Sequence, residues 1–103
     1  MSQLKQVLEK VRDENLPLDL LEKYRDQLVH FKTDLHATIA DFKKKRAVYL
    51  VSSEIQGVEA KKQAWDATED GLRLIELKGM ISGLQGEIDS LQGRIYGLLR
   101  LQG

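Results

Sequence analysis

The stretch between Leu77 and Leu98 constrains the fold most, because its large apolar residues alternate in steps of four and three. A mean spacing of about 3.5 residues keeps one side of a helix facing a partner helix along its whole length. Isoleucine takes one heptad position and leucine the other, which in a parallel pair favours two strands. We therefore predict that this seam is an oligomer interface, formed by Leu77, Ile81, Leu84, Ile88, Leu91, Ile95 and Leu98.

Small residues form a second stripe on the opposite side of the same predicted helix. They are Gly79, Gly83, Gly86, Ser90, Gly93 and Gly97. Each glycine inside a helix costs roughly 0.8–1 kcal/mol relative to alanine, so we expect these glycines to allow close packing against another helix. Gly86→Ala should then lower the melting temperature through overpacking. The alternative is a plain surface that faces water, while the charges along this helix exclude a dimer inside a membrane.

The rest of the chain has the composition of a helical protein, with 31% charged residues, 6% aromatic residues and one proline. An apolar face that ends before the proline predicts a short helix over residues 1–16. A second apolar stripe predicts a long helix over 19–52, and a third helix over 58–101 carries the seam. We predict one all-α domain, residues 1–103, folded as a long antiparallel helical hairpin or coiled coil with a short N-terminal helix.

Two segments are candidates for the place where the chain reverses between the long helices. Residues 53–57 offer capping-box spacing and a glycine, and residues 68–71 offer an Asp-Gly turn pair. The first turn lays the seam against about residues 16–37, which are rich in apolar side chains, and the second lays it against a polar segment. Each unburied large side chain forfeits roughly 1.5–3 kcal/mol, whereas a cap contributes about 1 kcal/mol. We therefore favour the first turn, and the second stays open if another subunit covers the seam.

A basic stretch, Lys43, Lys44, Lys45 and Arg46, is the strongest sign of a nucleic-acid site. Sixteen basic and sixteen acidic residues cancel, so the field of the whole molecule attracts neither nucleic acid nor acidic membranes. Four consecutive residues also spread around a helix rather than forming one face. The basic helix that precedes a leucine zipper in transcription factors is missing, since residues 51–76 carry three basic and six acidic side chains. Nucleic-acid binding through the basic stretch is therefore the alternative function.

Residue types that carry catalysis are sparse in this sequence. The chain has no cysteine, which excludes a thiolate nucleophile or zinc ligand and fits a reducing, cytoplasmic compartment. His30 and His36 lie six residues apart, on different faces of a helix, whereas metal ligands prefer a spacing of three or four. We expect Trp65 to be a packing anchor at a helix contact. The sequence predicts no enzyme activity, no metal, no cofactor, no signal peptide and no membrane span.

The seam and the glycines together predict a function in assembly. Apolar side chains at Met80, Leu99 and Leu101 widen the seam, which favours an intramolecular helix and a second subunit around it. We expect a non-catalytic, oligomeric coiled-coil protein, dimeric or higher, that binds another protein. It would act as an assembly, adaptor or accessory factor, a role common among small phage and bacterial helical proteins.

Overall fold

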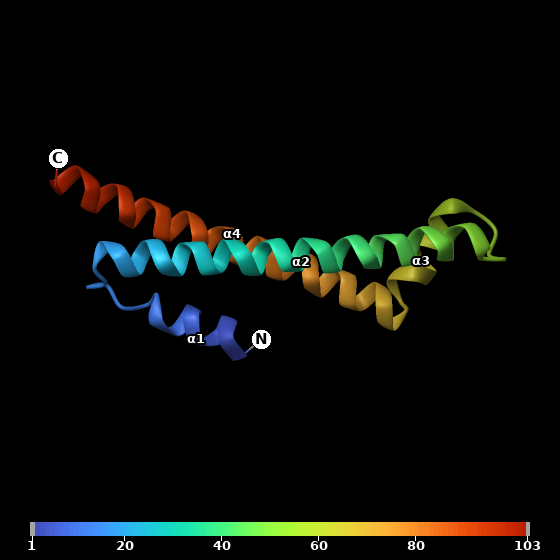
Figure 1. Ribbon diagram of the computed structural model, residues 1–103. Helices are drawn as coiled ribbons and strands as arrows, with labels where there is room; N and C mark the ends of the chain where they lie inside the picture. Colours follow the sequence, from blue (N-terminus) through green and yellow to red (C-terminus); the bar gives the residue numbers. More distant parts are fainter. Residues whose placement is uncertain (1, 103) are drawn as a thin grey trace. The chain divides into compact units, whose positions relative to one another are not determined.

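The computed structural model describes residues 2–102 of the chain, with the side chain of Ser2 left aside, and all regular secondary structure in this range is helical (Figure 1). The four helices are α1 (Ser2–Lys10), α2 (Leu18–Ser52), α3 (Val58–Asp66) and α4 (Glu69–Gln102). They form two compact units. Unit 1 combines Met1–Thr33 with Ser82–Gly103, and unit 2 is Asp34–Ile81, so α2 and α4 contribute to both. The predicted all-α class with a short N-terminal helix is confirmed.

The first helix is shorter than the predicted span 1–16, because α1 ends at Lys10. A tighter turn follows α1, in which each hydrogen bond spans three residues. The N–H of Arg12 donates to the carbonyl of Glu9, and the N–H of Asp13 donates to the carbonyl of Lys10, each at 3.3 Å. The Asp13 carboxylate then accepts the N–H of Asn15 at 2.9 Å, a local bond that competes with further helix. Helical structure resumes after the proline, whose carbonyl accepts the N–H of Leu21 at 3.1 Å.

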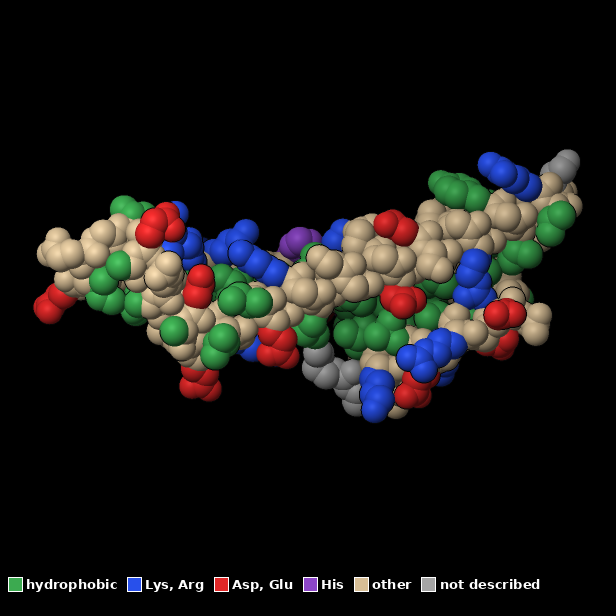
Figure 2. Space-filling view, turned by 180° about the vertical axis from the view of Figure 1, so that it is seen from behind, with side chains coloured by type: hydrophobic (Ala, Val, Ile, Leu, Met, Phe, Trp, Pro, Cys, Tyr) green, Lys and Arg blue, Asp and Glu red, His purple; other side chains and the backbone are tan. Residues whose placement is uncertain are grey.

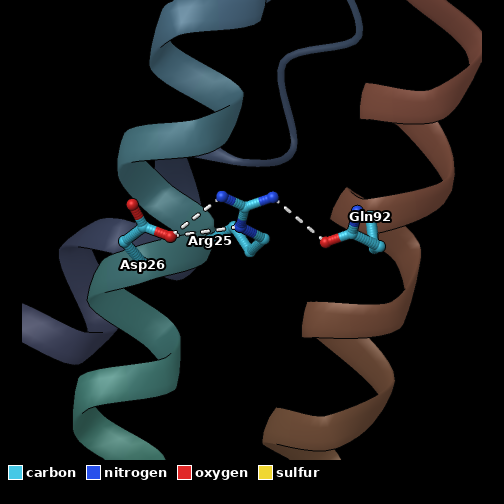
Figure 3. Close-up of polar contacts among 3 residues, drawn as sticks. All are labelled: Arg25, Asp26 and Gln92. Atoms are coloured by element: carbon cyan, nitrogen blue, oxygen red, sulfur yellow. Dashed lines mark hydrogen bonds and ion pairs between the residues drawn. The ribbon is translucent and has the colours of Figure 1, made fainter.

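Within unit 1, α2 and α4 run antiparallel in a register fixed by two polar contacts. The Arg25 guanidinium donates to the side-chain oxygen of Gln92 at 3.1 Å and also pairs with the neighbouring Asp26 (Figure 3). Seven residues further along α2, the Lys32 ammonium donates to Gln85, which lies seven residues back along α4. This register lays the second half of α4 against the beginning of α2. The reversal near residues 53–57 is therefore confirmed, and the alternative reversal at 68–71 is not adopted.

The core of unit 1 draws apolar side chains from three helical segments. The buried residues are Leu4, Val7 and Val11 at α1, Leu21, Tyr24 and Leu28 on α2, and Leu84, Ile88, Leu91 and Ile95 on α4. The Arg94 guanidinium ties α4 to the end of α1, donating to the Val11 carbonyl at 2.7 Å and to the Asp13 carbonyl at 2.5 Å. These carbonyls lie where a helix end leaves acceptors unsatisfied, so Arg94 caps α1 from another helix.

Unit 2 has its own apolar core, centred on the only tryptophan. Trp65 on α3 is buried together with Ile39 of α2 and with Leu74 and Leu77 of α4. Its ring lies 5.5 Å from the ring of Tyr49, centroid to centroid, in a tilted arrangement. Tilted aromatic pairs at this distance add to the stabilisation from burial alone. The prediction that Trp65 is a packing anchor is confirmed.

The helix predicted over 58–101 is divided at Ala67 and Thr68, which is a correction to the sequence prediction. The Thr68 hydroxyl donates to the Trp65 carbonyl at 2.6 Å and accepts the N–H of Gly71 at 3.0 Å. One side chain therefore ends α3 and caps the start of α4. Gly71 is buried in this junction, where a Cβ atom would overlap the backbone carbonyl of Trp65. The Asp-Gly pair is thus a helix junction rather than the place where the chain reverses.

Candidate interaction surfaces

The predicted oligomer seam is largely buried inside the single chain. In unit 1, Leu84, Ile88, Leu91 and Ile95 are buried and Leu98 is half-buried, and in unit 2 Leu77 is buried and Ile81 half-buried. Side chains of α1 and α2 therefore cover most of the seam within one chain, in the place of the predicted intramolecular helix. A second subunit at the seam stays a prediction.

The glycines of α4 lie on its outer surface. Gly83, Gly86, Gly93 and Gly97 in unit 1, and Gly79 in unit 2, are all exposed, and a Cβ atom added at any of them would meet nothing within 4 Å. No described segment of the chain packs against them. The predicted close helix packing is therefore absent within one chain and stays a prediction about contact with a second molecule.

Large apolar side chains accompany the glycines near the end of α4 in unit 1. Tyr96, Leu99 and Leu101 are exposed. We call the surface formed by Gly83, Gly86, Ser90, Gly93, Tyr96 and Gly97 the outer face of α4. An open hollow of about 500 Å³ adjoins this end, lined by Glu14, Leu16, Leu21, Arg94, Gly97, Leu98, Arg100 and Leu101. The hollow is lined mostly by apolar residues with three charged side chains among them, a composition that resembles a protein–protein interface.

The basic stretch of α2 does not form one cationic face. Lys43, Lys44 and Lys45 are exposed, whereas Arg46 is half-buried on the side that faces the core of unit 2. The Lys45 ammonium lies 4.8 Å from the centre of the Phe42 ring, a cation–π contact. Three of the four cations are therefore accessible, and they point in different directions around the helix, as the sequence predicts.

Four exposed aliphatic side chains lie around the connection between α2 and α3, and sequence reasoning assigned them no functional role. Val48, Val51, Ile55 and Val58 have exposed fractions of 68%, 87%, 40% and 66%. They are spaced three, four and three residues apart, which is the pattern of a buried helical stripe, so the sequence does not indicate that these side chains are exposed. Because α2 ends at Ser52, the stripe does not continue along one helix and its members stay on the surface. We call these four residues the aliphatic tip.

Groups suited to chemistry do not gather in the part of the chain that the structure describes. No cluster of three or more His, Asp or Glu residues within residues 2–102 could hold a metal ion. The indole N–H of Trp65 is buried and has no hydrogen-bond partner in this range.

No helix of the described chain is both long enough and apolar enough to cross a bilayer. The ion pairs of Lys62 with Glu59 at 3.6 Å and of Arg73 with Glu76 at 2.9 Å are exposed surface pairs.

Comparisons with protein-family models, with curated proteins and with solved structures gave no significant match to this chain.

Proposed function

We propose that this protein is a non-catalytic helical assembly, adaptor or accessory factor, which self-associates through the outer face of α4 and binds a protein partner. The observation that carries the proposal is the open glycine stripe on an exposed helix face of unit 1. A surface helix would ordinarily place strong helix formers there.

The energetic cost of the stripe supports a packing role. Four exposed glycines in the unit 1 part of α4 cost on the order of 3–4 kcal/mol relative to alanine. That is a large fraction of the 5–15 kcal/mol by which a folded domain is typically stable. A second helix that approaches closely on the bare backbone would offset this cost, because small residues let helices pack with short interaxial distances.

The polar character of the neighbouring positions fits a contact in water rather than in lipid. Glu87 and Asp89 flank the face on opposite sides, and Arg94 and Arg100 lie further along the helix. The exposed ring of Tyr96 adds a large apolar surface with a polar hydroxyl, a residue type enriched at protein interfaces. The seam is less suited to this role, because its side chains are largely buried within the chain.

Sedimentation velocity over a range of protein concentrations tests the self-association. We expect the wild type to form a dimer or larger species at tens of micromolar. The double variant Gly86→Leu, Gly93→Leu should be monomeric, because its side chains fill the open face, yet it should keep its helical circular dichroism. Thr33→Leu, an exposed change on α2 in the same unit, serves as the matched control and should associate as the wild type does. A wild type that stays monomeric at every concentration would remove self-association from the proposal.

The protein partner is tested by affinity capture from the native cell. Immobilised wild type should retain a partner that the Tyr96→Asp, Leu99→Asp variant loses, because charge at an apolar contact is costly to desolvate. The Thr33→Leu variant should retain it. Equal retention by all three proteins would place the partner site elsewhere on the molecule.

A further inference from the structure

The aliphatic tip and the basic stretch lie together in unit 2, and neither is used by the proposed self-association. Val48 and Val51 end α2, Ile55 lies in the connection, and Val58 begins α3. All four are exposed, although soluble surfaces rarely gather several large aliphatic side chains around one short connection. Figure 2 shows apolar side chains on the surface at this end of unit 2, together with Lys and Arg side chains and with Asp and Glu side chains.

The segment that carries the tip is basic, although unit 2 as a whole holds eight basic and eight acidic side chains. Residues 43–62 hold six basic side chains and two acidic ones, a net charge of +4. One of the two acids, Glu59, already faces Lys62 at 3.6 Å. Within residues 2–102, Lys43, Lys44 and Lys45 form no ion pair, and Lys45 contacts the Phe42 ring, so the charges of Lys43 and Lys44 are the most accessible to a partner.

Helix geometry places cations and aliphatic groups on one side of α2. Lys44, Val48 and Val51 are four and three residues apart, which aligns them along one face. Lys43 and Lys45 lie on either flank of this face. The opposite side of the helix carries Ile39, Phe42 and Tyr49, which belong to the core of unit 2. The accessible face of α2 therefore carries Val48 and Val51 near the end of the helix, and the lysine ammonium groups one to two turns earlier.

We propose that the aliphatic tip binds an anionic lipid surface. The four aliphatic side chains would enter the boundary between headgroups and acyl chains, and the lysines would contact the lipid phosphates and carboxylates. Nucleic acid fits the same cations but leaves the aliphatic groups in water, since phosphate contacts need no apolar surface. A surface that is anionic at its boundary and apolar beneath contacts both the cations and the aliphatic groups. The proposal is independent of the outer face of α4.

Vesicle co-sedimentation with the full chain tests the proposal. The probes are vesicles of phosphatidylcholine alone and of phosphatidylcholine with about one-third phosphatidylserine. We expect binding to the anionic vesicles and little to the neutral ones. Val48→Asp with Val51→Asp should weaken binding by at least about tenfold, because charged side chains do not enter the boundary region. Changing Lys43, Lys44 and Lys45 to Gln should weaken it by about 100-fold, since each cation contributes a factor of about five.

Matched controls separate the tip from general effects of charge. Val29→Asp changes an exposed valine of α2 in unit 1 and should leave binding within about twofold. Lys5→Gln, Lys23→Gln and Lys78→Gln together remove the same amount of charge from exposed positions outside residues 43–62. This triple variant should reduce vesicle binding much less than the Lys43, Lys44 and Lys45 changes do. All variants change exposed positions, and the buried Trp65 reports by its fluorescence that unit 2 is folded.

Three outcomes would overturn the proposal. The first is the absence of binding to anionic vesicles at low ionic strength. The second is binding that the valine changes leave intact, which would mean adsorption by charge alone. The third is tight binding of duplex DNA at physiological salt that the three lysine changes abolish, which would assign the cations to nucleic acid.

Discussion

Substitution by alanine should have opposite effects on the free energy of unfolding at Gly71, in the junction between α3 and α4, and at Gly86, on the outer face of α4. In Gly71→Ala, the added methyl group would overlap the Trp65 carbonyl oxygen and lie 2.8 Å from its carbonyl carbon and 2.9 Å from the Cα of Asp66. All three contacts are backbone atoms, so no flexible side chain can move aside. In Gly86→Ala, the methyl group enters open space.

The magnitudes follow from this geometry. Overpacking against a rigid neighbour costs up to about 3 kcal/mol, and alanine returns about 1 kcal/mol of helix propensity. Gly71→Ala should therefore lower the free energy of unfolding by about 2 kcal/mol, or about 10 °C in melting temperature. Gly86→Ala should raise the free energy of unfolding of the monomer by about 0.8–1 kcal/mol. Sequence reasoning predicted that Gly86→Ala destabilises, and the open space around this residue reverses that expectation for a single chain.

Urea unfolding at low micromolar protein, followed by circular dichroism and Trp65 fluorescence, measures both effects while association is weak. At higher concentration, Gly86→Ala should lose part of its advantage as the outer face of α4 becomes engaged. A Gly71→Ala protein as stable as the wild type would refute the close approach of α3 to α4. A Gly86→Ala protein that is less stable at low concentration would refute the open outer face.

Three further substitutions probe the two units. Thr68→Ala removes the cap shared by α3 and α4 and should cost about 1–2 kcal/mol, measured by thermal unfolding. Arg94→Gln removes the charged donors to the carbonyls that end α1, so amide hydrogen exchange in α1 should accelerate while exchange in α4 changes little. Leu91→Ala should cost about 2–5 kcal/mol even in dilute monomer, because this side chain is fully buried in unit 1; a loss seen only in the oligomer would place the seam between subunits.

The helical class and the register of the hairpin could be predicted because both depend on the periodicity of large apolar side chains. The seam pairs with the apolar part of α2, as the cost of leaving such side chains in water requires. Gln85 and Gln92 flank the seam and are uncharged, so the sequence shows no charge pairing from which to infer their partners. In the structure they accept hydrogen bonds from Lys32 and Arg25 across the hairpin. Periodicity identifies a buried face, but it does not tell whether the covering helix belongs to the same chain.

Other features could not be predicted because they depend on particular contacts in space. The break at Thr68 arises from one hydroxyl that serves two helix ends, and the surrounding sequence still has helical periodicity. The early end of α1 reflects the Asp13 side chain bonding to Asn15. The aliphatic tip has the spacing of a core stripe, and only the end of α2 at Ser52 shows that its residues are exposed.

Because the chain has no cysteine, disulfide cross-linking of single-cysteine variants tests self-association through the outer face of α4 most directly. Disulfides form only when the two Cα atoms are within about 7 Å. Ser90→Cys and Gly86→Cys place a thiol on this face, Thr33→Cys is an exposed control on α2, and Leu91→Cys lies in the buried seam. We predict covalent dimers under mild oxidation for at least one outer-face variant, and none for Thr33→Cys or Leu91→Cys. Dimers from Leu91→Cys alone, or from no variant, would contradict the account.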